Sequence, residues 1–183
     1  MLKSNIRKKI LNLRKLENRK NIQLQFSAIY NILKKNNLKN KSIGGYYPVN
    51  YEIDDLGILK ELEKKKFKIS LPVIKKNNEM DFYKWSFKDN LNLNLNIYGI
   101  PEPEQTKLVC PDIILVPLVA FDKRLFRLGY GGGFYDRYIE KLFKKKIFLT
   151  IGLALSCQKI SRVPNHKYDK KLDIIVTEKY ILK

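Results

Sequence analysis

Residues 113–137 read IILVPLVAFDKRLFRLGYGGGFYDR, which joins a strand-forming run to a glycine-rich loop and the start of a helix. The β-branched run Ile113–Val116 is typical of a buried central strand. Pro117–Gly133 is then predicted to be a long functional loop, and Phe134–Lys145 to be a helix. Ligands in open α/β sheets bind beyond the carboxyl ends of the strands. This order therefore places the loop at the edge of the sheet where a ligand is expected.

The rest of the chain alternates predicted helices with predicted strands. Ile6, Ile10, Leu13 and Leu16 have the spacing of an apolar helix face. Further helices are expected over residues 21–35 and 55–65, and strands over Ser42–Tyr47, Phe67–Leu71, Met80–Trp85, Ile147–Leu153 and Ile174–Val176. We expect the second strand to end at Pro72, and residues 98–103 to form a rigid proline turn. The alternation predicts one α/β domain, residues 1–183, with a mostly parallel central sheet.

The composition is that of a globular protein with excess positive charge. The 183 residues include 37 Lys and Arg against 18 Asp and Glu, a net charge of +19. No apolar run approaches the roughly 20 residues that span a bilayer, and no apolar stretch of a secretory signal follows the basic start. Cys110 and Cys157 lie far apart without CxxC spacing, so we expect two reduced thiols in a cytoplasmic protein without a membrane partner.

The positive charge has two interpretations. A basic surface attracts nucleic acid or other anions. However, the lysines are spread along the whole chain together with many Asn and Ile residues, a combination that an AT-rich genome also produces. Because a run of charge is more often a solvated face, we disfavour nucleic acid as the partner.

The glycine-rich loop has the features of a phosphate site. Four of the five residues 129–133 are glycine, which takes positive φ and lets the backbone approach a ligand. N–H groups at the start of a helix form an anion site. Arg127 and Arg137 add fork-shaped donors that match phosphate. The loop has neither the Gly-Lys-Ser/Thr of a Walker loop nor GxGxxG spacing. We favour a nucleotide-phosphate site over a plain glycine turn.

Carboxylates near the loop could add a metal ion. Asp136 lies in the first turn of the predicted helix, where it either complements the helix dipole or binds magnesium beside the phosphates. Magnesium often takes one or two protein carboxylates. Asp169 and Asp173 are the candidates for a second one, and the sequence leaves open whether Asp173 reaches Asp136.

An aromatic loop forms a second group of candidate residues. Glu52 lies close to Tyr46, Tyr47 and Tyr51. Aromatic rings can stack on a flat heterocycle while a carboxylate accepts two of its N–H bonds. The alternative is that Glu52 is an exposed loop residue.

Other polar residues give weaker signals. Lys3 and Arg7 share one face of the first helix, which by itself indicates only a solvated basic face. His166 is the only histidine and has no serine or cysteine nucleophile arrangement to serve. We therefore expect it at the surface, and an acyl-transfer triad is not supported.

The whole pattern resembles the 5-formyltetrahydrofolate cyclo-ligase family, also called methenyltetrahydrofolate synthetase. The long motif in residues 112–122 and 127–137 carries the resemblance, which extends over nearly the whole chain. Lys3 and Arg7 look like the family's N-terminal Lys-x-x-x-Arg. Other similar segments are Tyr47-Pro48 with Glu52, Phe67–Pro72, Tyr98–Pro103, Asp169 and Leu172–Glu178. The chain departs from the family at residues 165–167, where acidic residues are common, and near Lys171, where a proline is common.

The resemblance implies a three-layer α/β/α domain that closes 5-formyltetrahydrofolate to 5,10-methenyltetrahydrofolate with ATP and magnesium, releasing ADP and phosphate. It implies ATP contacts from Lys3, Ser4, Asn5, Ile6, Arg7, Arg127, Leu128, Gly129, Tyr130, Gly131, Gly132, Gly133, Phe134 and Tyr135. It implies folate contacts from Tyr47, Glu52, Tyr98, Tyr130, Gly131, Gly132, Gly133 and Phe134, and magnesium ligands at Asp136 and Asp173. Arg127 and Tyr130 would stabilise charge during catalysis, without a covalent nucleophile. We expect the active form to be a monomer.

Three alternatives remain at this stage. One is a basic nucleic-acid-binding protein. Another is an enzyme on the same scaffold that does not use ATP, such as a sugar-phosphate isomerase or an acyl-CoA transferase. A third is a folate-binding relative without turnover.

Overall fold

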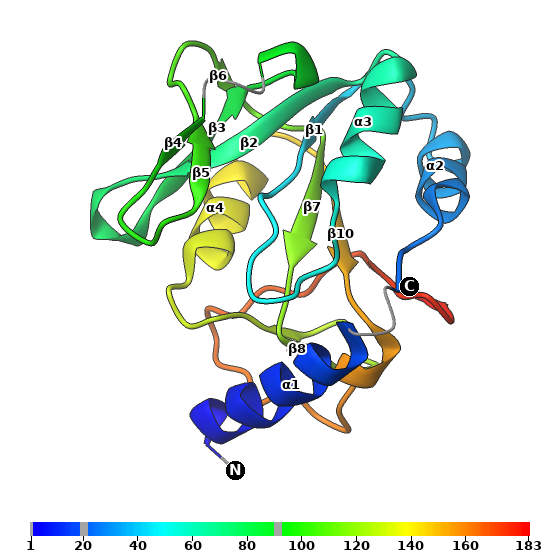
Figure 1. Cartoon of the computed structure of the whole chain (residues 1–183), viewed down its shortest axis with the longest axis vertical. Helices are drawn as coiled ribbons and strands as arrows, with labels where there is room; N and C mark the ends of the chain where they lie inside the picture. The colour runs from blue at the N-terminus through cyan, green and yellow to red at the C-terminus, as the bar shows by residue number, and fades with distance from the viewer. Residues whose placement is uncertain (1, 19–21, 90–92) are drawn as a thin grey trace.

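The computed structural model describes residues 2–18, 22–89 and 93–183. Its α-helices are α1 (Lys3–Asn18), α2 (Phe26–Lys35), α3 (Leu56–Lys64) and α4 (Phe134–Phe143), with short 3-10 helices at Lys76–Asn78, Phe87–Asp89 and Ser156–Gln158. Figure 1 shows α2 and α3 on one side of the sheet, α4 on the other, and α1 across one end. The expected three-layer α/β/α arrangement is therefore confirmed.

In the described part of the chain, the main sheet has eight strands in the order β12-β11-β10-β7-β1-β2-β3-β6. They are β1 (Ser42–Gly44), β2 (Lys68–Ile74), β3 (Met80–Lys84), β6 (Leu108–Val109), β7 (Ile113–Pro117), β10 (Leu149–Leu153), β11 (Ile174–Val176) and β12 (Ile181–Leu182). The pairs from β11 through β10, β7 and β1 to β2 are parallel, and the pairs at both edges are antiparallel. The predicted mostly parallel sheet is thus confirmed, with β7 near its centre.

The two faces of the sheet pack into separate apolar clusters. Along β7, Ile113 and Leu115 belong to the cluster under α2 and α3, while Ile114 and Val116 belong to the cluster under α4. This alternation follows from the two-residue period of a strand, and burying such side chains stabilises the fold by roughly 1.5–3 kcal/mol each. A run that is apolar at every position is what a strand covered on both faces requires.

Helix α1 closes the carboxyl end of the sheet, toward which the β7 arrow points in Figure 1. Ile6 and Ile10 are buried against Val119 and Leu128, which lie beyond the end of β7. Leu13 and Leu16 were also expected on the apolar face, but both are exposed. Arg14 follows Ile10 at the same four-residue spacing by which Ile10 follows Ile6, and it is buried. The buried face of the helix therefore ends in a charged side chain.

Strand β2 does not end at Pro72, as the sequence predicted, but continues to Ile74. The parallel pairing with β1 stops at Ser70, whose carbonyl accepts the Gly45 N–H at 2.9 Å. The backbone N and C=O of Pro72 face the same side of the strand as those of Ser70, the side of β1, but β1 has already ended at that point. The missing N–H of proline therefore removes no ladder bond. Antiparallel pairing with β3, on the other side, continues past Pro72.

Two hairpins lie outside the main sheet where loops were expected. The predicted turn at residues 98–103 is partly a strand, since β5 (Pro101–Pro103) pairs with β4 (Leu93–Leu95). The turn itself is made by Asn96, whose side-chain oxygen accepts the N–H groups of Tyr98 and Ile100 at 2.8 and 3.1 Å. Within the predicted loop 117–133, β8 (Ala120–Phe121) pairs with β9 (Arg127–Leu128).

Several element ends differ from their predicted positions. The strand expected to reach Tyr47 ends at Gly44, because the Tyr46 N–H leaves the ladder and donates to Asp55 at 3.0 Å. The start expected for the second helix at residue 21 lies outside the described residues, and the described helix begins at Phe26.

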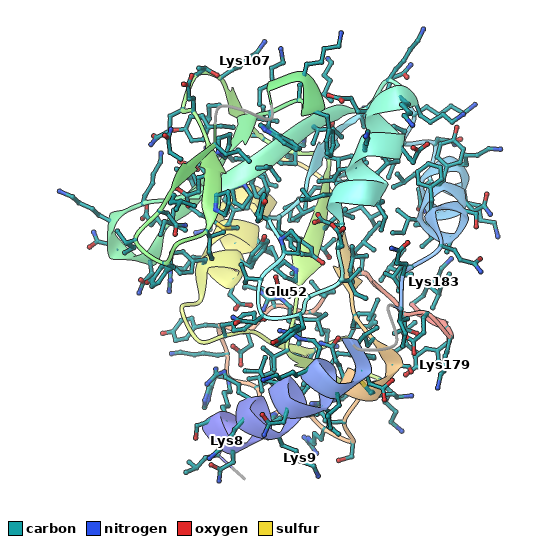
Figure 2. All side chains as sticks on the ribbon, in the orientation of Figure 1. Lys8, Lys9, Glu52, Lys107, Lys179 and Lys183 are labelled. Atoms are coloured by element: carbon teal, nitrogen blue, oxygen red, sulfur yellow. The ribbon has the colours of Figure 1, made fainter. Side chains whose placement is uncertain are left out.

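The positive charges are spread over the surface. Figure 2 labels Lys8, Lys9, Lys107, Lys179 and Lys183, which point outward from different sides of the molecule. None of the helices in the described ranges is long and apolar enough to cross a membrane.

Candidate active site

A cavity of about 690 Å³ lies at the carboxyl end of β7. Its walls come from α1, the loop after β1, the β4–β5 hairpin and the glycine loop before α4. Figure 2 shows Glu52 in the middle of the molecule, between the sheet and α1. The predicted site residues that line the cavity are Lys3, Arg7, Tyr47, Glu52, Tyr98, Arg127, Leu128, Gly129, Tyr130, Gly131, Gly132, Gly133, Phe134, Tyr135 and Asp136.

The glycine loop is built around two left-handed glycines. Gly131 has φ 117° and Gly133 has φ 69°, values that other residues reach only with strain. Gly133 is also the N-cap of α4, and having no side chain it makes no capping hydrogen bond to this helix end. The first N–H groups of α4 are therefore left for a ligand, at the positive end of the helix dipole. The loop has the backbone geometry of an anion cradle.

The two arginines of the motif have different positions. Arg127 is 6% exposed and contacts both carboxylate oxygens of Asp136 at 3.3 Å. Its Nε has no partner among the described residues. Arg137 is exposed and donates to the Asn78 carbonyl at 2.9 and 2.7 Å and to the Gly132 carbonyl. Arg127 thus faces the cavity, whereas Arg137 supports the loop from outside.

Helix α1 contributes one face to the cavity. The Lys3 ammonium contacts Asp169 at 2.8 Å, and Arg7 Nε donates to the Gly129 carbonyl at 2.8 Å. The residues between them, Ser4, Asn5 and Ile6, do not line the cavity: the first two are exposed and the third is buried in the core. Only positions three or four apart share a helix face, so the side chains of five consecutive residues do not all line the cavity.

The structure separates the candidate metal ligands. Asp136 accepts the Lys170 N–H at 3.1 Å, which brings Asp169 close to it, and Asp169 lines the cavity. Asp173 does not line it. The carboxylate of Asp173 accepts the N–H and hydroxyl of Thr150 at 2.8 and 2.7 Å, at the start of β10 and β11. This is the amino edge of the sheet, opposite the loop, so the expected pair of Asp136 and Asp173 is not brought together.

Asp169 is held in its charged form. Partial burial alone would raise its pKa, but the Lys3 ammonium and the backbone N–H of His166 lower the pKa below its ordinary value. His166 itself is exposed, as expected. The charge of Asp169 is therefore available at neutral pH to a cation in the cavity.

Glu52 forms the opposite wall. Its carboxylate accepts the Val49 N–H at 2.9 Å, and the Tyr130 hydroxyl lies close enough to lower its pKa. Burial raises the pKa of Glu52 to about 7, although Val49, Arg14 and Tyr130 each favour the charged form. A carboxylate with so few donors around it has unused acceptor capacity for a ligand.

Aromatic side chains surround this wall. Tyr98 and Phe134 meet edge to face with ring centroids 6.4 Å apart, and Tyr47 lines the same cavity. The Tyr135 hydroxyl is buried and has no partner in the part of the chain that the structure describes. An unpartnered buried hydroxyl beside a cavity is consistent with a polar ligand that completes it.

Sequence reasoning missed Arg14. Arg14 is one of two arginines in a lysine-rich helix and gives no local signal of its own, and only its i+4 spacing from Ile10 could have indicated that it faces inward. Its side chain is 1% exposed and contacts the Tyr130 hydroxyl.

The fold and the cavity define the class of protein, an α/β enzyme whose site joins a glycine loop with the backbone geometry of an anion cradle to an aromatic wall that carries a carboxylate. The family model described as the 5-formyltetrahydrofolate cyclo-ligase family matches residues 1–178. The chain belongs to this family and is a ligase.

Relatives and solved structures agree with this assignment. The 5-formyltetrahydrofolate cyclo-ligase of Haemophilus influenzae is 31% identical over 96% of this chain and 95% of its own length. That of Escherichia coli K12 is 30% identical over 69% of this chain and 71% of its own length. The 5,10-methenyltetrahydrofolate synthetase of Aquifex aeolicus has 34% identity and a TM-score of 0.75, covering 100% of this chain and 93% of that one. The synthetase of Mycoplasma pneumoniae has 25% identity and a TM-score of 0.69, covering 97% and 99%.

Proposed function

We propose that the protein uses ATP and magnesium to close 5-formyltetrahydrofolate to 5,10-methenyltetrahydrofolate, releasing ADP and phosphate. The observation that carries the proposal is that one cavity joins the glycine cradle with Arg127 to the aromatic wall with Glu52. Family membership and the names of the relatives support the same substrate.

The glycine side of the cavity suits the triphosphate. The free N–H groups at the start of α4 and the guanidinium of Arg127 are donors that match phosphate oxygens. Lys3 and Arg7 add two cations from α1. These groups would spread the charge of a transferring phosphoryl group, which needs positioning and electrostatics more than a covalent partner.

The carboxylates suit magnesium. Asp136 and Asp169 both line the cavity, and each is balanced by a cation, Arg127 and Lys3 respectively. The described residues contain no group of three or more His, Cys, Asp or Glu side chains that could hold a metal ion. Two carboxylates completed by phosphate oxygens and water are nevertheless a common magnesium site. We therefore propose Asp169 as the partner of Asp136. When bound, magnesium would neutralise charge on the phosphates and orient them.

The reaction follows from the chemistry of the formyl group. The formyl oxygen is a poor leaving group, so it first attacks the terminal phosphorus of ATP, and ADP departs. The neighbouring folate nitrogen then attacks the formyl carbon and loses its proton. The carbon–oxygen bond breaks, phosphate leaves, and the product is a resonance-stabilised cation. Holding the nitrogen close to the carbon supplies much of the rate, because the attack is intramolecular.

The aromatic side suits the pterin. Its ring can stack beside Tyr47, Tyr98 and Phe134, while the Glu52 carboxylate accepts two N–H bonds from the amino-bearing edge. The walls that we have described all come from one chain, so we propose that a monomer is active. Cys110 and Cys157 are both free, which supports a cytoplasmic location.

The decisive experiment mixes the protein with 5-formyltetrahydrofolate, magnesium and ATP and follows the methenyl chromophore in the near ultraviolet. We expect absorbance to grow only when all four are present, with one ADP formed per product. ATP-independent product, or no product from the folded protein whether or not it binds folate, would exclude the proposal.

The metal assignment has its own test. Asp136→Ala and Asp169→Ala should each reduce turnover by roughly 10²–10³-fold, as loss of one transition-state charge contact typically does. The same variants should weaken binding of Mg·ADP in calorimetric titrations, which needs no turnover.

Asp173→Asn is the matched control, because its amide oxygen can still accept the Thr150 hydrogen bonds. Turnover close to wild type is expected. If Asp173→Asn loses Mg·ADP binding and Asp169→Ala keeps it, the pair proposed here is wrong.

A further inference from the structure

Arg14 lies where three segments around the cavity meet. Its Nη1 donates to the Leu118 carbonyl at 3.1 Å, just after β7. Its Nη2 donates to the Asn50 carbonyl at 2.7 Å and to the Tyr130 hydroxyl oxygen. Asn50 belongs to the loop that carries Glu52, and Tyr130 belongs to the glycine loop. One buried guanidinium on α1 therefore connects the end of the central strand with both loops that face the ligand.

The Tyr130 hydroxyl extends this contact to Glu52. Because the phenol oxygen accepts from Arg14, its O–H remains to donate to the Glu52 carboxylate. The guanidinium also lies 5.6 Å from the centroid of the Tyr130 ring, within cation–π range. The Tyr130 side chain is thus held at its ring and at its hydroxyl.

We propose that Arg14 is a positioning residue for the folate side of the site, acting through the Tyr130 hydroxyl and the Asn50 carbonyl to hold Glu52 toward the pterin. The inference rests on the proposed function, since it assumes that Glu52 binds the amino-bearing edge of a folate. Arg14 itself does not line the cavity. Its effect on the ligand is therefore carried by Tyr130 and by the backbone of the loop.

The charge of Glu52 makes the role of Arg14 measurable as a pH dependence of folate binding. Burial raises the pKa of Glu52 to about 7, and Arg14 is the cation that opposes this. The other titratable groups near Glu52 are Tyr46 and Asp55 from its own side, Tyr130 from the glycine loop and Tyr135 from α4. Pterin N–H donors need the ionised carboxylate, so folate binding should improve as pH rises through 7.

Kinetic variants test the relay. In Tyr130→Phe the ring remains but the hydroxyl is lost. We expect its KM for 5-formyltetrahydrofolate to rise about tenfold, the effect of losing one hydrogen bond to a charged group, with KM for ATP nearly unchanged. Arg14→Lys keeps the charge but cannot make the three hydrogen bonds of the guanidinium at once. We expect the same result, a higher KM for 5-formyltetrahydrofolate with KM for ATP nearly unchanged. In both variants the apparent pKa of the folate KM profile should shift upward.

The double variant Arg14→Lys/Tyr130→Phe separates a relay from two independent contacts. If the two side chains act in series, its KM should be no higher than that of the worse single variant. Independent contacts would multiply, and this outcome would overturn the proposal. Arg162→Lys is the matched control, because Arg162 is an exposed arginine that does not line this cavity, and it should leave every parameter unchanged.

Stability is measured for every variant. A purely structural role predicts a lower melting temperature with an unchanged pH profile, which would also overturn the proposal. If Arg14→Lys does not fold, Tyr130→Phe alone still decides, through the rise in its KM for folate but not for ATP and through its pH profile.

Titration of 5-formyltetrahydrofolate without ATP separates a failure of the proposed function from a failure of the role of Arg14. Absent turnover in the wild type would reject the proposed function, whereas wild-type folate binding with unchanged binding in both variants would reject only the role of Arg14.

Discussion

The glycines of the loop differ in how strictly the backbone requires glycine at their positions. Gly131 has φ 117°, where any side chain is strained, and Gly133 has φ 69°. Gly129 has no left-handed φ, and an added Cβ there would meet Arg127 Nη1 only at 3.8 Å. The cradle therefore needs glycine at 131 and 133 for backbone reasons, whereas position 129 could accept a small side chain.

Substitution of these positions should show the difference. Gly131→Ala should lower the free energy of unfolding by about 1–3 kcal/mol and weaken nucleotide binding, because the loop must either strain or change shape. Gly129→Ala should change stability by less than about 0.5 kcal/mol. Urea unfolding and titration with Mg·ADP measure both effects. Equal effects at the two positions would contradict the assignment of strain to φ.

Among the elements, the β4–β5 hairpin is joined to the end of β2 by one carboxylate, in addition to the packing of Leu93 against the core. Glu102 accepts the N–H of Ile74, at the end of β2, at 2.8 Å and the side-chain amide of Asn96 at 2.7 Å. The hairpin carries Tyr98 and Pro101, which line the cavity. A single residue thus links the sheet, the hairpin turn and the aromatic wall.

Removal of this link should loosen the folate side of the site. Glu102→Ala leaves the Ile74 N–H without its partner, which costs roughly 1–3 kcal/mol where the group stays buried. We expect a higher KM for 5-formyltetrahydrofolate, with little change in KM for ATP. Glu104→Ala, at an exposed position on the same segment, is the control. Matched kinetic constants for the two variants would show that the hairpin does not need Glu102.

Over the whole molecule, a clamp at the amino edge of the sheet joins β1, β7 and the chain after α4. Asp112 accepts the N–H and hydroxyl of Ser42 at 2.8 and 2.7 Å and the Lys146 ammonium at 2.5 Å. Partial burial disfavours its charge, but these donors lower the pKa to about 2. Because one sheet connects the elements, we propose that residues 1–183 unfold as one domain.

The clamp predicts acid sensitivity. The pKa of Asp112 is lower in the folded chain than its ordinary value of 3.8, so its stabilisation is present above pH 4 and is lost as pH falls toward 2. The carboxylate is partly exposed, so the contribution is about 1 kcal/mol after solvent screening. In denaturant unfolding, Asp112→Asn should be less stable than wild type at pH 6, and the difference should disappear near pH 2. A difference that is constant with pH would exclude the ionised clamp.

The sequence predicted those parts of the site that lie within one continuous segment of the chain. The run Ile113–Val116, the glycines and Asp136 lie within one continuous strand–loop–helix unit, and their places in the fold follow from spacing alone. The choice between Asp169 and Asp173 depends on where each carboxylate lies in space: Asp169 lines the cavity, whereas Asp173 lies at the amino edge of the sheet beside Thr150. The path of β2 through Pro72 depends on where β1 stops. Neither fact has a local signal.

The order of residues determined a mostly parallel α/β sheet, a glycine turn before a helix and a family resemblance, because hydrophobic period and glycine φ act over a few neighbouring positions. Tertiary structure decided which distant groups share one cavity. It buried Arg14 beneath the Asn50 carbonyl and Tyr130, and it left Asp173 at the far edge with Thr150. The physical reason is that burial and hydrogen-bond partners depend on the packing of α1 and both loops against the sheet, and no stretch of sequence encodes such contacts by itself.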